Sequence, residues 1–257
     1  MKVFVTGASS GIGAATAVAF AEAGHTVGIC ARREDRMAEV LERCQKAQPA
    51  SRMWVADLSE LDALDALAAR VDDELGGVDV LVNNAGVPKR RRVRAMTATD
   101  LESVMAMNYH SPVRLALAFL PGMIERERGE IINISSFGVH SAPFGVGAYV
   151  ASKAALELFT ESMYLELADT AVRVRIVVPG TTRTEFSDDK PDNEPSMVRG
   201  AASGASAEEV AAAIVSAVGT DAFITYATAK DGEGAAAKAA DPNGFLAGAR
   251  EMLRSYI

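Results

Sequence analysis

Three residues in the middle of the chain have the types and spacing of an acid–base site. Ser136 follows an apolar segment that reads as a strand, and Tyr149 and Lys153 lie four residues apart in a segment that reads as a helix. Side chains at i and i+4 share one helix face, about 6 Å apart, and an ammonium beside a phenol favours the phenolate and lowers its pKa. The pattern predicts a phenol that donates a proton, an ammonium that lowers the pKa of this phenol, and a hydroxyl that holds a carbonyl oxygen.

The same Tyr-x-x-x-Lys spacing occurs a second time, at Tyr226 and Lys230. That pair falls where an expected strand passes into a loop, and side chains four apart are not packed side by side there. We interpret the second match as chance, because the surrounding pattern and not the spacing alone selects the first.

The alternation of elements predicts one α/β domain over residues 1–257 with a parallel, doubly wound sheet. Continuous apolar strands alternate with helices, as in buried parallel sheets. The expected strands span 2–6, 25–31, 51–57, 78–82, 129–135, 172–180 and 222–227, and the longer expected helices span 33–47, 60–75, 100–127 and 149–168.

Composition excludes several classes of function. The net charge of −8 argues against a nucleic-acid-binding surface, and no apolar stretch approaches the 18 residues that indicate a membrane span. The three His and two Cys are scattered, so no metal site is expected. Cys30 and Cys44, in a chain whose start does not resemble a signal peptide, suggest reduced thiols and a cytoplasmic protein.

The chain opens with strand, glycine-rich turn and helix, the arrangement in which backbone N–H groups hold phosphate. Gly7, Gly11 and Gly13 form this turn, although a plain strand–helix corner would look similar. The second strand ends in Arg32 and Arg33, where guanidinium groups suit a ribose 2′-phosphate, so NADP is favoured over NAD. The alternative is that both arginines are solvated and pair with acids of the following helix.

The helix over 100–127 is predicted to bend. Thr99 and Glu102 have capping-box spacing, and Pro112 has no N–H to give the carbonyl of Asn108. The prediction is that this carbonyl is free to hold a water. A kink that only suits the packing is the alternative.

Lys89–Arg94 places five bases in six residues of an acidic protein. A solvated loop that pairs with acids, on another subunit for instance, is the simpler interpretation. Because loops at the carboxyl ends of strands face the ligand crevice, recognition of an anionic substrate is the alternative. Turnover with Arg90, Arg91 and Arg92 changed to Ser decides between them.

The sequence supports predictions for two further segments and for one histidine. Residues 181–205 are rich in Gly, Pro, Asp and Ser, as expected of a functional loop that covers the substrate. Residues 229–241 are rich in Ala, Gly and Asp and are expected to be poorly ordered. His140 is expected to be solvated or to cap a helix.

Taken together, these motifs resemble the short-chain dehydrogenase/reductase family. The matching residues occur in the family's order over about 180 residues: Thr6-Gly-Ala-Ser-Ser-Gly-Ile-Gly13, Asp57, Asn83-Asn-Ala-Gly86, Asn108, Ser136, Tyr149-x-x-x-Lys153 and Pro179-Gly180. The resemblance implies a seven-stranded Rossmann fold in three αβα layers and an NAD(P)-linked oxidoreductase.

The resemblance also implies roles for individual residues. Ser136 and Tyr149 would bind the substrate oxygen, Tyr149 would move the proton, Lys153 would hold the nicotinamide ribose, and Asn108 would pass protons through a water. The implied cofactor-binding residues are Gly7, Ser9, Ser10, Gly11, Ile12, Gly13, Arg32, Arg33, Asp57, Leu58, Asn83, Asn84, Ala85, Gly86, Tyr149, Lys153, Pro179, Gly180, Thr182 and Thr184.

The expected function is reversible hydride transfer between NADP(H) and a carbonyl or secondary alcohol, in a homodimer or homotetramer. An NAD-linked secondary alcohol dehydrogenase is the alternative within enzymes. A protein that senses or scaffolds NADP(H) without turnover is the alternative from another class. The sequence does not identify the substrate.

Overall fold

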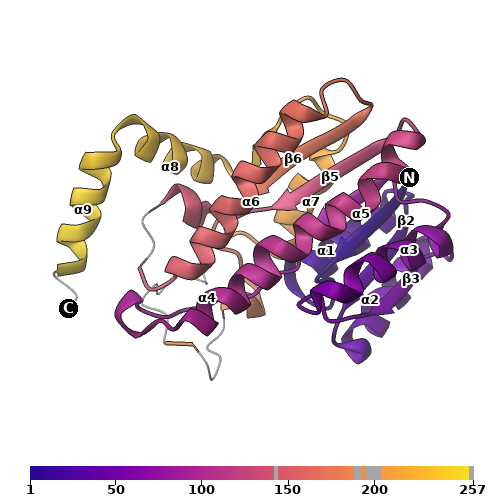
Figure 1. Ribbon diagram of the computed structural model, residues 1–257, viewed down its shortest axis with the longest axis horizontal. Coiled ribbons are helices and arrows are strands. Elements are labelled where there is room, and N and C mark those ends of the chain that lie inside the picture. Colours follow the sequence, from indigo (N-terminus) through magenta and orange to yellow (C-terminus); the bar gives the residue numbers. More distant parts are fainter. Residues whose placement is uncertain (142–143, 188–192, 195–203, 255–257) are drawn as a thin grey trace.

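A seven-stranded parallel sheet forms the centre of the computed structural model, which describes residues 1–141, 144–187, 193–194 and 204–254 (Figure 1). The strand order is β3-β2-β1-β4-β5-β6-β7, as the alternating pattern predicts. The strands are β1 (Lys2–Thr6), β2 (Thr26–Ala31), β3 (Arg52–Val55), β4 (Val80–Asn83), β5 (Gly129–Ile134), β6 (Val172–Val178) and β7 (Ile224–Tyr226).

Helices cover both faces of the sheet, which explains why the central strands are apolar on both sides. One face carries α1 (Gly11–Glu22), α2 (Glu34–Ala47) and α7 (Ala207–Ala217). The other carries α3 (Leu64–Leu75), α5 (Ser111–Glu125) and α6 (Gly147–Glu166). Every residue of β4 is buried, whereas the edge strands β3 and β7 are partly exposed.

The order of the strands locates the ligand crevice. The chain runs outward from β1 to β3 on one side and then returns to place β4 on the other side of β1. In open parallel sheets a ligand binds at such a reversal, beyond the carboxyl ends of the strands. The glycine turn after β1 and Asn83-Asn84 at the end of β4 lie there.

The expected helix over 100–127 is divided into three parts. Helix α4 (Ala98–Met105) passes into a π-helical turn (Ala106–His110) and then into α5. Pro112 lies in the first turn of α5, where its missing N–H is tolerated. The predicted capping box was wrong by two residues, because Thr97 and Asp100 form it.

Residues 229–240 are helical, although their composition is typical of a loop. They form α8 (Ala229–Ala240), which begins at Thr228 as N-cap, and the expected poor order of 229–241 stays a prediction. Lys238 ties this helix to the body by donating hydrogen bonds to the Val139 and Ser141 carbonyls. Helix α9 (Pro242–Arg254) extends from α8 away from the sheet (Figure 1).

Short 3₁₀ turns complete the connections: Leu61–Ala63, Val93–Ala95, Phe137–His140 and Glu185–Ser187. Within the described ranges no helix combines the length and apolarity needed to cross a membrane, and no three or more His, Cys, Asp or Glu residues converge as a metal site. Cys30 and Cys44 are both buried free thiols.

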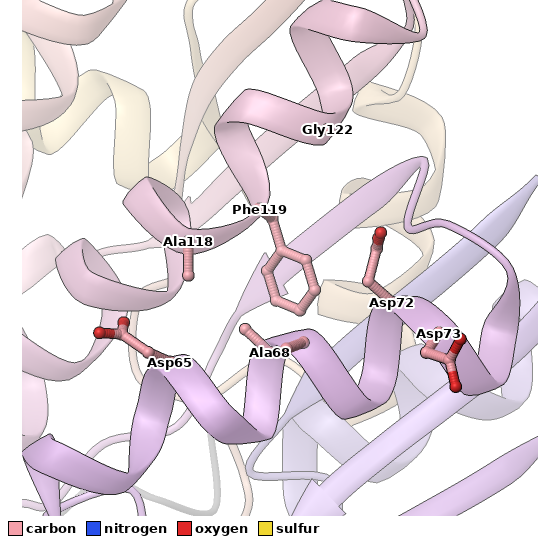
Figure 2. Close-up of a pocket in the computed structure, with 8 residues that line it drawn as sticks. Asp65, Ala68, Asp72, Asp73, Ala118, Phe119 and Gly122 are labelled. Atoms are coloured by element: carbon pink, nitrogen blue, oxygen red, sulfur yellow. The ribbon is translucent and has the colours of Figure 1, made fainter.

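A shallow surface pocket lies along the contact between α3 and α5 (Figure 2). Phe119 of α5 faces Ala68 of α3 there, and Asp65, Asp72 and Asp73 of α3 line the pocket. No residue that lines it belongs to the predicted site, so it contributes nothing to the site at the strand ends.

Candidate active site

The structure brings Ser136 and Tyr149 together. Ser136 lies two residues after the end of β5 and caps the short turn over Phe137–His140, where its hydroxyl accepts a hydrogen bond from the Gly138 N–H at 3.0 Å. Tyr149 lies in the first turn of α6, close enough to Ser136 for the serine side chain to lower the pKa of its phenol. Two hydroxyls therefore converge where the sequence places a substrate oxygen.

Lys153 lies one turn further along α6 and is 3% exposed. Its ammonium nitrogen Nζ donates to the Ile134 carbonyl at 2.7 Å. Burial lowers the pKa of Lys153 to about 8, and the nearby carboxylate of Glu157 partly opposes this shift. A Cβ on Gly86 would lie 3.2 Å from Asn108 Oδ1 and 3.7 Å from Lys153 Nζ, so these three predicted residues meet at one point.

The pKa of Tyr149 is raised above its ordinary value, which is opposite to the expected direction. Burial of the phenol is the larger cause, and the hydrogen bond from Ser136 only partly offsets it. The sequence argument included the charge of Lys153 but not the cost of burying a phenolate. In the protein as described, Tyr149 is therefore a protonated phenol at neutral pH.

Asn108 occupies the π-helical turn and is fully buried. Its amide accepts from the Val87 N–H at 2.8 Å and donates to the Val87 carbonyl and to Ser152 Oγ, both at 3.1 Å. Ser152 Oγ in turn donates to the Tyr149 carbonyl at 2.7 Å. The side chain of Asn108 thus joins the loop after β4 to the helix of Tyr149.

Sequence reasoning missed Glu157, which lies one helical turn beyond Lys153. Glu157, on the buried face of α6, accepts a hydrogen bond from Ser135 Oγ, and His140 Nε2 lies 3.2 Å from Glu157 Oε1. The expectation of a solvated or capping His140 was therefore wrong, because this ring pairs with a carboxylate. The signal was Glu157 itself, a charged residue four positions after Lys153 on the same helix face.

The glycine turn fits a phosphate group. Gly7 and Gly11 have φ of +68° and +55°, a region that side-chain-bearing residues rarely adopt. A Cβ on Gly13 would lie 2.4 Å from Asn84 Nδ2. Asn84 Nδ2 also donates to the Thr6 carbonyl at 2.9 Å, which ties the end of β4 to the turn.

Arginine side chains extend the turn into an anion-binding cradle. Arg33 donates to Ser9 Oγ at 3.0 Å and to Ser10 Oγ at 2.6 Å, so three predicted cofactor residues meet. Arg36, which sequence reasoning missed, lies one helical turn beyond Arg33 and contacts both carboxylate oxygens of Glu185. The carboxylate of Glu185 already occupies this cradle, so the guanidinium donors of the cradle also suit a phosphate group.

Arg32 points to a different partner. Its Nη1 lies 3.4 Å from Asp57 Oδ2, and that carboxylate also accepts from the Ser59 N–H and hydroxyl. The alternative in which both arginines pair with acids of α2 is not what the structure shows. Arg33, rather than Arg32, joins the glycine turn.

The other predicted cofactor residues lie around the strand ends. Asn83 is buried and donates to Asn133 Oδ1 at 2.9 Å and to the Pro112 carbonyl at 3.1 Å. After β6, Thr182 Oγ1 donates to the Gly180 carbonyl at 3.1 Å. The side chain of Thr184 lies 3.1 Å from where a Cβ on Gly11 would be. Leu58 is buried, and Ile12 packs against the core.

The basic run pairs with acids of its own chain. Lys89 Nζ and Arg91 Nε lie 2.7 Å and 3.3 Å from the Asp100 carboxylate, whose pKa falls to about 2, mainly through the hydrogen bond with Lys89. Arg92 Nε lies 3.4 Å from Glu194, and its guanidinium lies over the Phe144 ring at 5.4 Å. Lys89, Arg91 and Arg92 therefore pair with acids, as the simpler interpretation expects, and recognition of an anionic substrate by this run stays a prediction. Most of 181–205, the expected cover, lies outside the described residues.

Comparison with known proteins identifies the family. The model of the family described as short chain dehydrogenase matches residues 1–195. The chain belongs to the short-chain dehydrogenase/reductase family. An uncharacterised oxidoreductase of Mycobacterium bovis is 40% identical over 71% of this chain. The alignment covers 55% of that relative's length, so this chain spans about half of the relative it matches.

A fatty acyl-CoA reductase of Acinetobacter baylyi is 35% identical over 88% of this chain and 79% of its own length. Solved structures agree with the fold. A short-chain dehydrogenase of Streptomyces avermitilis superposes with a TM-score of 0.82 at 31% identity, over 98% of this chain and 97% of its own. One from Sphingobium yanoikuyae, solved with NADPH, gives 0.79 at 28% identity over 100% and 96%.

Proposed function

We propose that this chain is an NADP(H)-dependent oxidoreductase that transfers a hydride between nicotinamide C4 and a carbonyl or secondary alcohol carbon. The observation that carries the proposal is that Ser136 lies close enough to the buried Tyr149 to lower the pKa of its phenol, with Lys153 one helical turn further along α6. The same strand ends carry the anion cradle of Arg33, Ser9 and Ser10. Chemistry and cofactor recognition therefore share one crevice.

In the direction of reduction, Tyr149 is the general acid. Its raised pKa keeps the phenol protonated, so it can donate to the oxygen that gains charge as the carbonyl is reduced. Ser136 donates a second hydrogen bond to the same oxygen. The ammonium of Lys153 stabilises the phenolate that Tyr149 becomes, and a pKa of about 8 leaves it mostly charged at neutral pH.

The cofactor would be held by residues that are already arranged. The glycine turn would receive the pyrophosphate, and Arg33 and Arg36 would receive the ribose 2′-phosphate. When bound, NADPH supplies the hydride. Solved relatives crystallised with NADP+ or NADPH support this preference. NAD remains the alternative, because the glycine turn alone does not select the phosphate.

The substrate class is open, and the relatives suggest where to begin. Two curated relatives are named fatty acyl-CoA reductases, one 35% and one 37% identical. A substrate panel should therefore include long-chain aldehydes and acyl-CoA thioesters beside small ketones. The basic run leaves an anionic substrate as a second possibility, with the serine substitutions above as its test.

Self-association is also proposed. The layer of α4, α5 and α6 exposes large apolar side chains, among them Leu117 at 51%, Leu158 at 65% and Leu165 at 71%. Such surfaces are typical of homodimer interfaces. Light scattering on the purified protein measures the number of subunits.

The deciding experiment is a carbonyl panel with NADPH and NADH, monitored by cofactor oxidation. Tyr149→Phe should lower turnover at least about a thousandfold, because the proton donor is lost, while NADPH binding stays near wild type. Tyr164→Phe, an exposed tyrosine of the same helix, is the matched control and should keep full activity. Cofactor binding without turnover of any substrate would favour a sensor or scaffold instead.

A further inference from the structure

Two consecutive residues after β6, Thr184 and Glu185, contact two different predicted cofactor-binding elements. Thr184 packs over Gly11 of the glycine turn, with its side chain 3.1 Å from the position of a Cβ there. The next residue, Glu185, extends its carboxylate to α2. Glu185 Oε2 lies 3.3 Å from Arg33 Nη1 and 2.6 Å from Arg36 Nη1.

Arg33 holds two kinds of partner at the same time. Its Nη2 donates to the hydroxyls of Ser9 and Ser10, while its Nη1 faces Glu185. Arg36 Nη1 contacts both carboxylate oxygens of Glu185, at 2.6 and 2.7 Å. The carboxylate therefore sits where donors from α2 converge beside the glycine turn.

A carboxylate and a phosphate are alternative ligands for a guanidinium group, because both present acceptor oxygens to the same planar fork. A phosphate monoester carries about −1.5 to −2 charges at pH 7 and three acceptor oxygens. It is the stronger ligand, but it can use these donors only when the carboxylate leaves. The two anions cannot share the cradle without mutual repulsion.

We propose that Glu185 is a built-in competitor of the cofactor's 2′-phosphate and thereby sets how strongly the protein prefers NADP(H) over NAD(H). The inference rests on the proposed function, because it presumes that a dinucleotide binds in this crevice. The carboxylate blocks only the extra phosphate. A cofactor without that phosphate leaves the ion pairs of Glu185 intact.

The size of the effect follows from exposure. The side chains of Arg33, Arg36 and Glu185 are 43%, 41% and 52% exposed, so water screens their ion pairs. Because exposed ion pairs contribute little, removing the competitor should tighten NADPH binding by about three- to tenfold.

Glu185→Gln is the direct test, because glutamine keeps the size of the side chain and removes its charge. Calorimetry would measure the Kd of NADPH, NADH, 2′,5′-ADP and 5′-AMP with wild type and variant, independently of turnover. We expect NADPH and 2′,5′-ADP to bind about three- to tenfold more tightly to the variant. NADH and 5′-AMP should change less than about twofold.

Glu39→Gln is the matched control. Glu39 is exposed on the same helix as Arg36, so this substitution removes one negative charge nearby without emptying the cradle. It should leave the NADPH affinity close to wild type. If both substitutions tighten NADPH equally, net charge and not competition explains the gain, and the proposal is wrong.

A double-mutant cycle with Arg36→Ala adds a second readout. Without Arg36 the carboxylate has lost its closest partner, so Glu185→Gln should then change NADPH affinity less than in wild type. Thermal unfolding of each variant shows that it is folded.

The outcomes separate this inference from the function on which it rests. If wild type binds NADPH but Glu185→Gln binds it no more tightly, Glu185 is only an anchor for its segment and this inference alone fails. Equal tightening of NADH and NADPH also contradicts it, because no phosphate is then involved. If wild type binds neither dinucleotide, both the inference and the proposed function fail.

Discussion

The proposed catalytic group and the proposed phosphate cradle lie at the same edge of the sheet but are built differently. Asn108, Ser152 and Lys153 are at most 3% exposed, and neighbouring backbone or side-chain groups hold each of them. Arg33 and Arg36 are more than 40% exposed, and both pair with the same carboxylate, that of Glu185. The comparison teaches that buried contacts position the proposed chemistry, whereas exposed charges form the group proposed to select the cofactor. Substitutions should therefore affect stability and rate on one side, and affinity alone on the other.

The largest effect should come from Asn108→Ala. Three partners, the Val87 N–H, the Val87 carbonyl and Ser152 Oγ, would lose their hydrogen bonds inside the core. Each buried group left without a partner costs about 1–3 kcal/mol, so urea unfolding should show a loss of several kcal/mol. Turnover should fall as well, because Ser152 holds the Tyr149 carbonyl. An unfolding midpoint equal to wild type would break the comparison.

The second effect is a pH dependence of the catalytic side. Burial lowers the pKa of Lys153 to about 8, so its ammonium is present below that pH and is lost above it. The kcat/KM for carbonyl reduction should be level near pH 7 and fall as pH rises through about 8. The raised pKa of Tyr149 keeps the phenol protonated over this range.

Glu157 provides the control for this profile. Its carboxylate raises the pKa of Lys153, so Glu157→Gln should move the fall in rate to lower pH. Glu161→Gln, at an exposed position one turn further along α6, should leave the profile in place. A rate that stays level to pH 10 in wild type would show that the charge of Lys153 does not matter.

The smallest effect should come from the exposed side. Arg33→Ala removes charge-assisted hydrogen bonds worth about 1.5–3 kcal/mol, so the Kd for NADPH should rise by about ten- to a hundredfold. NADH affinity and the unfolding midpoint should remain near wild type, because exposed ion pairs add little stability. Arg43→Ala on the same helix is the control. Arg32→Ala should matter less than Arg33→Ala, because Arg32 faces Asp57.

The sequence predicted those parts of the site that depend on residue type and order. The glycine turn, the spacing of Asn108 four residues before Pro112, and the Tyr149–Lys153 spacing depend on local backbone geometry. Their positions in the fold therefore followed from the sequence. The seven strands followed in the same way from continuous apolar segments. The site roles drawn from the family resemblance, including the water at the Asn108 carbonyl, stay predictions.

The parts that were missed depend on contacts between distant segments. Glu185 and Arg36 are 149 positions apart, and no local pattern predicts their pairing. The direction of the Tyr149 pKa depends on how deeply α6 packs, which charge spacing does not report. Helix α8 was missed because its composition is that of a loop, while Lys238 and the carbonyls that it binds are about 100 positions apart.

One ring contact connects the segment of Glu185 with Tyr149. Phe186 lies against the ring of Tyr149, with centroids 5.8 Å apart, and its neighbour in the chain is Glu185. Because Glu185 and Phe186 are consecutive, a backbone displacement that takes the carboxylate out of the cradle would also change the contact of the phenyl ring with Tyr149. Steady-state kinetics should then be of the compulsory-order type, with the nucleotide arriving first and leaving last.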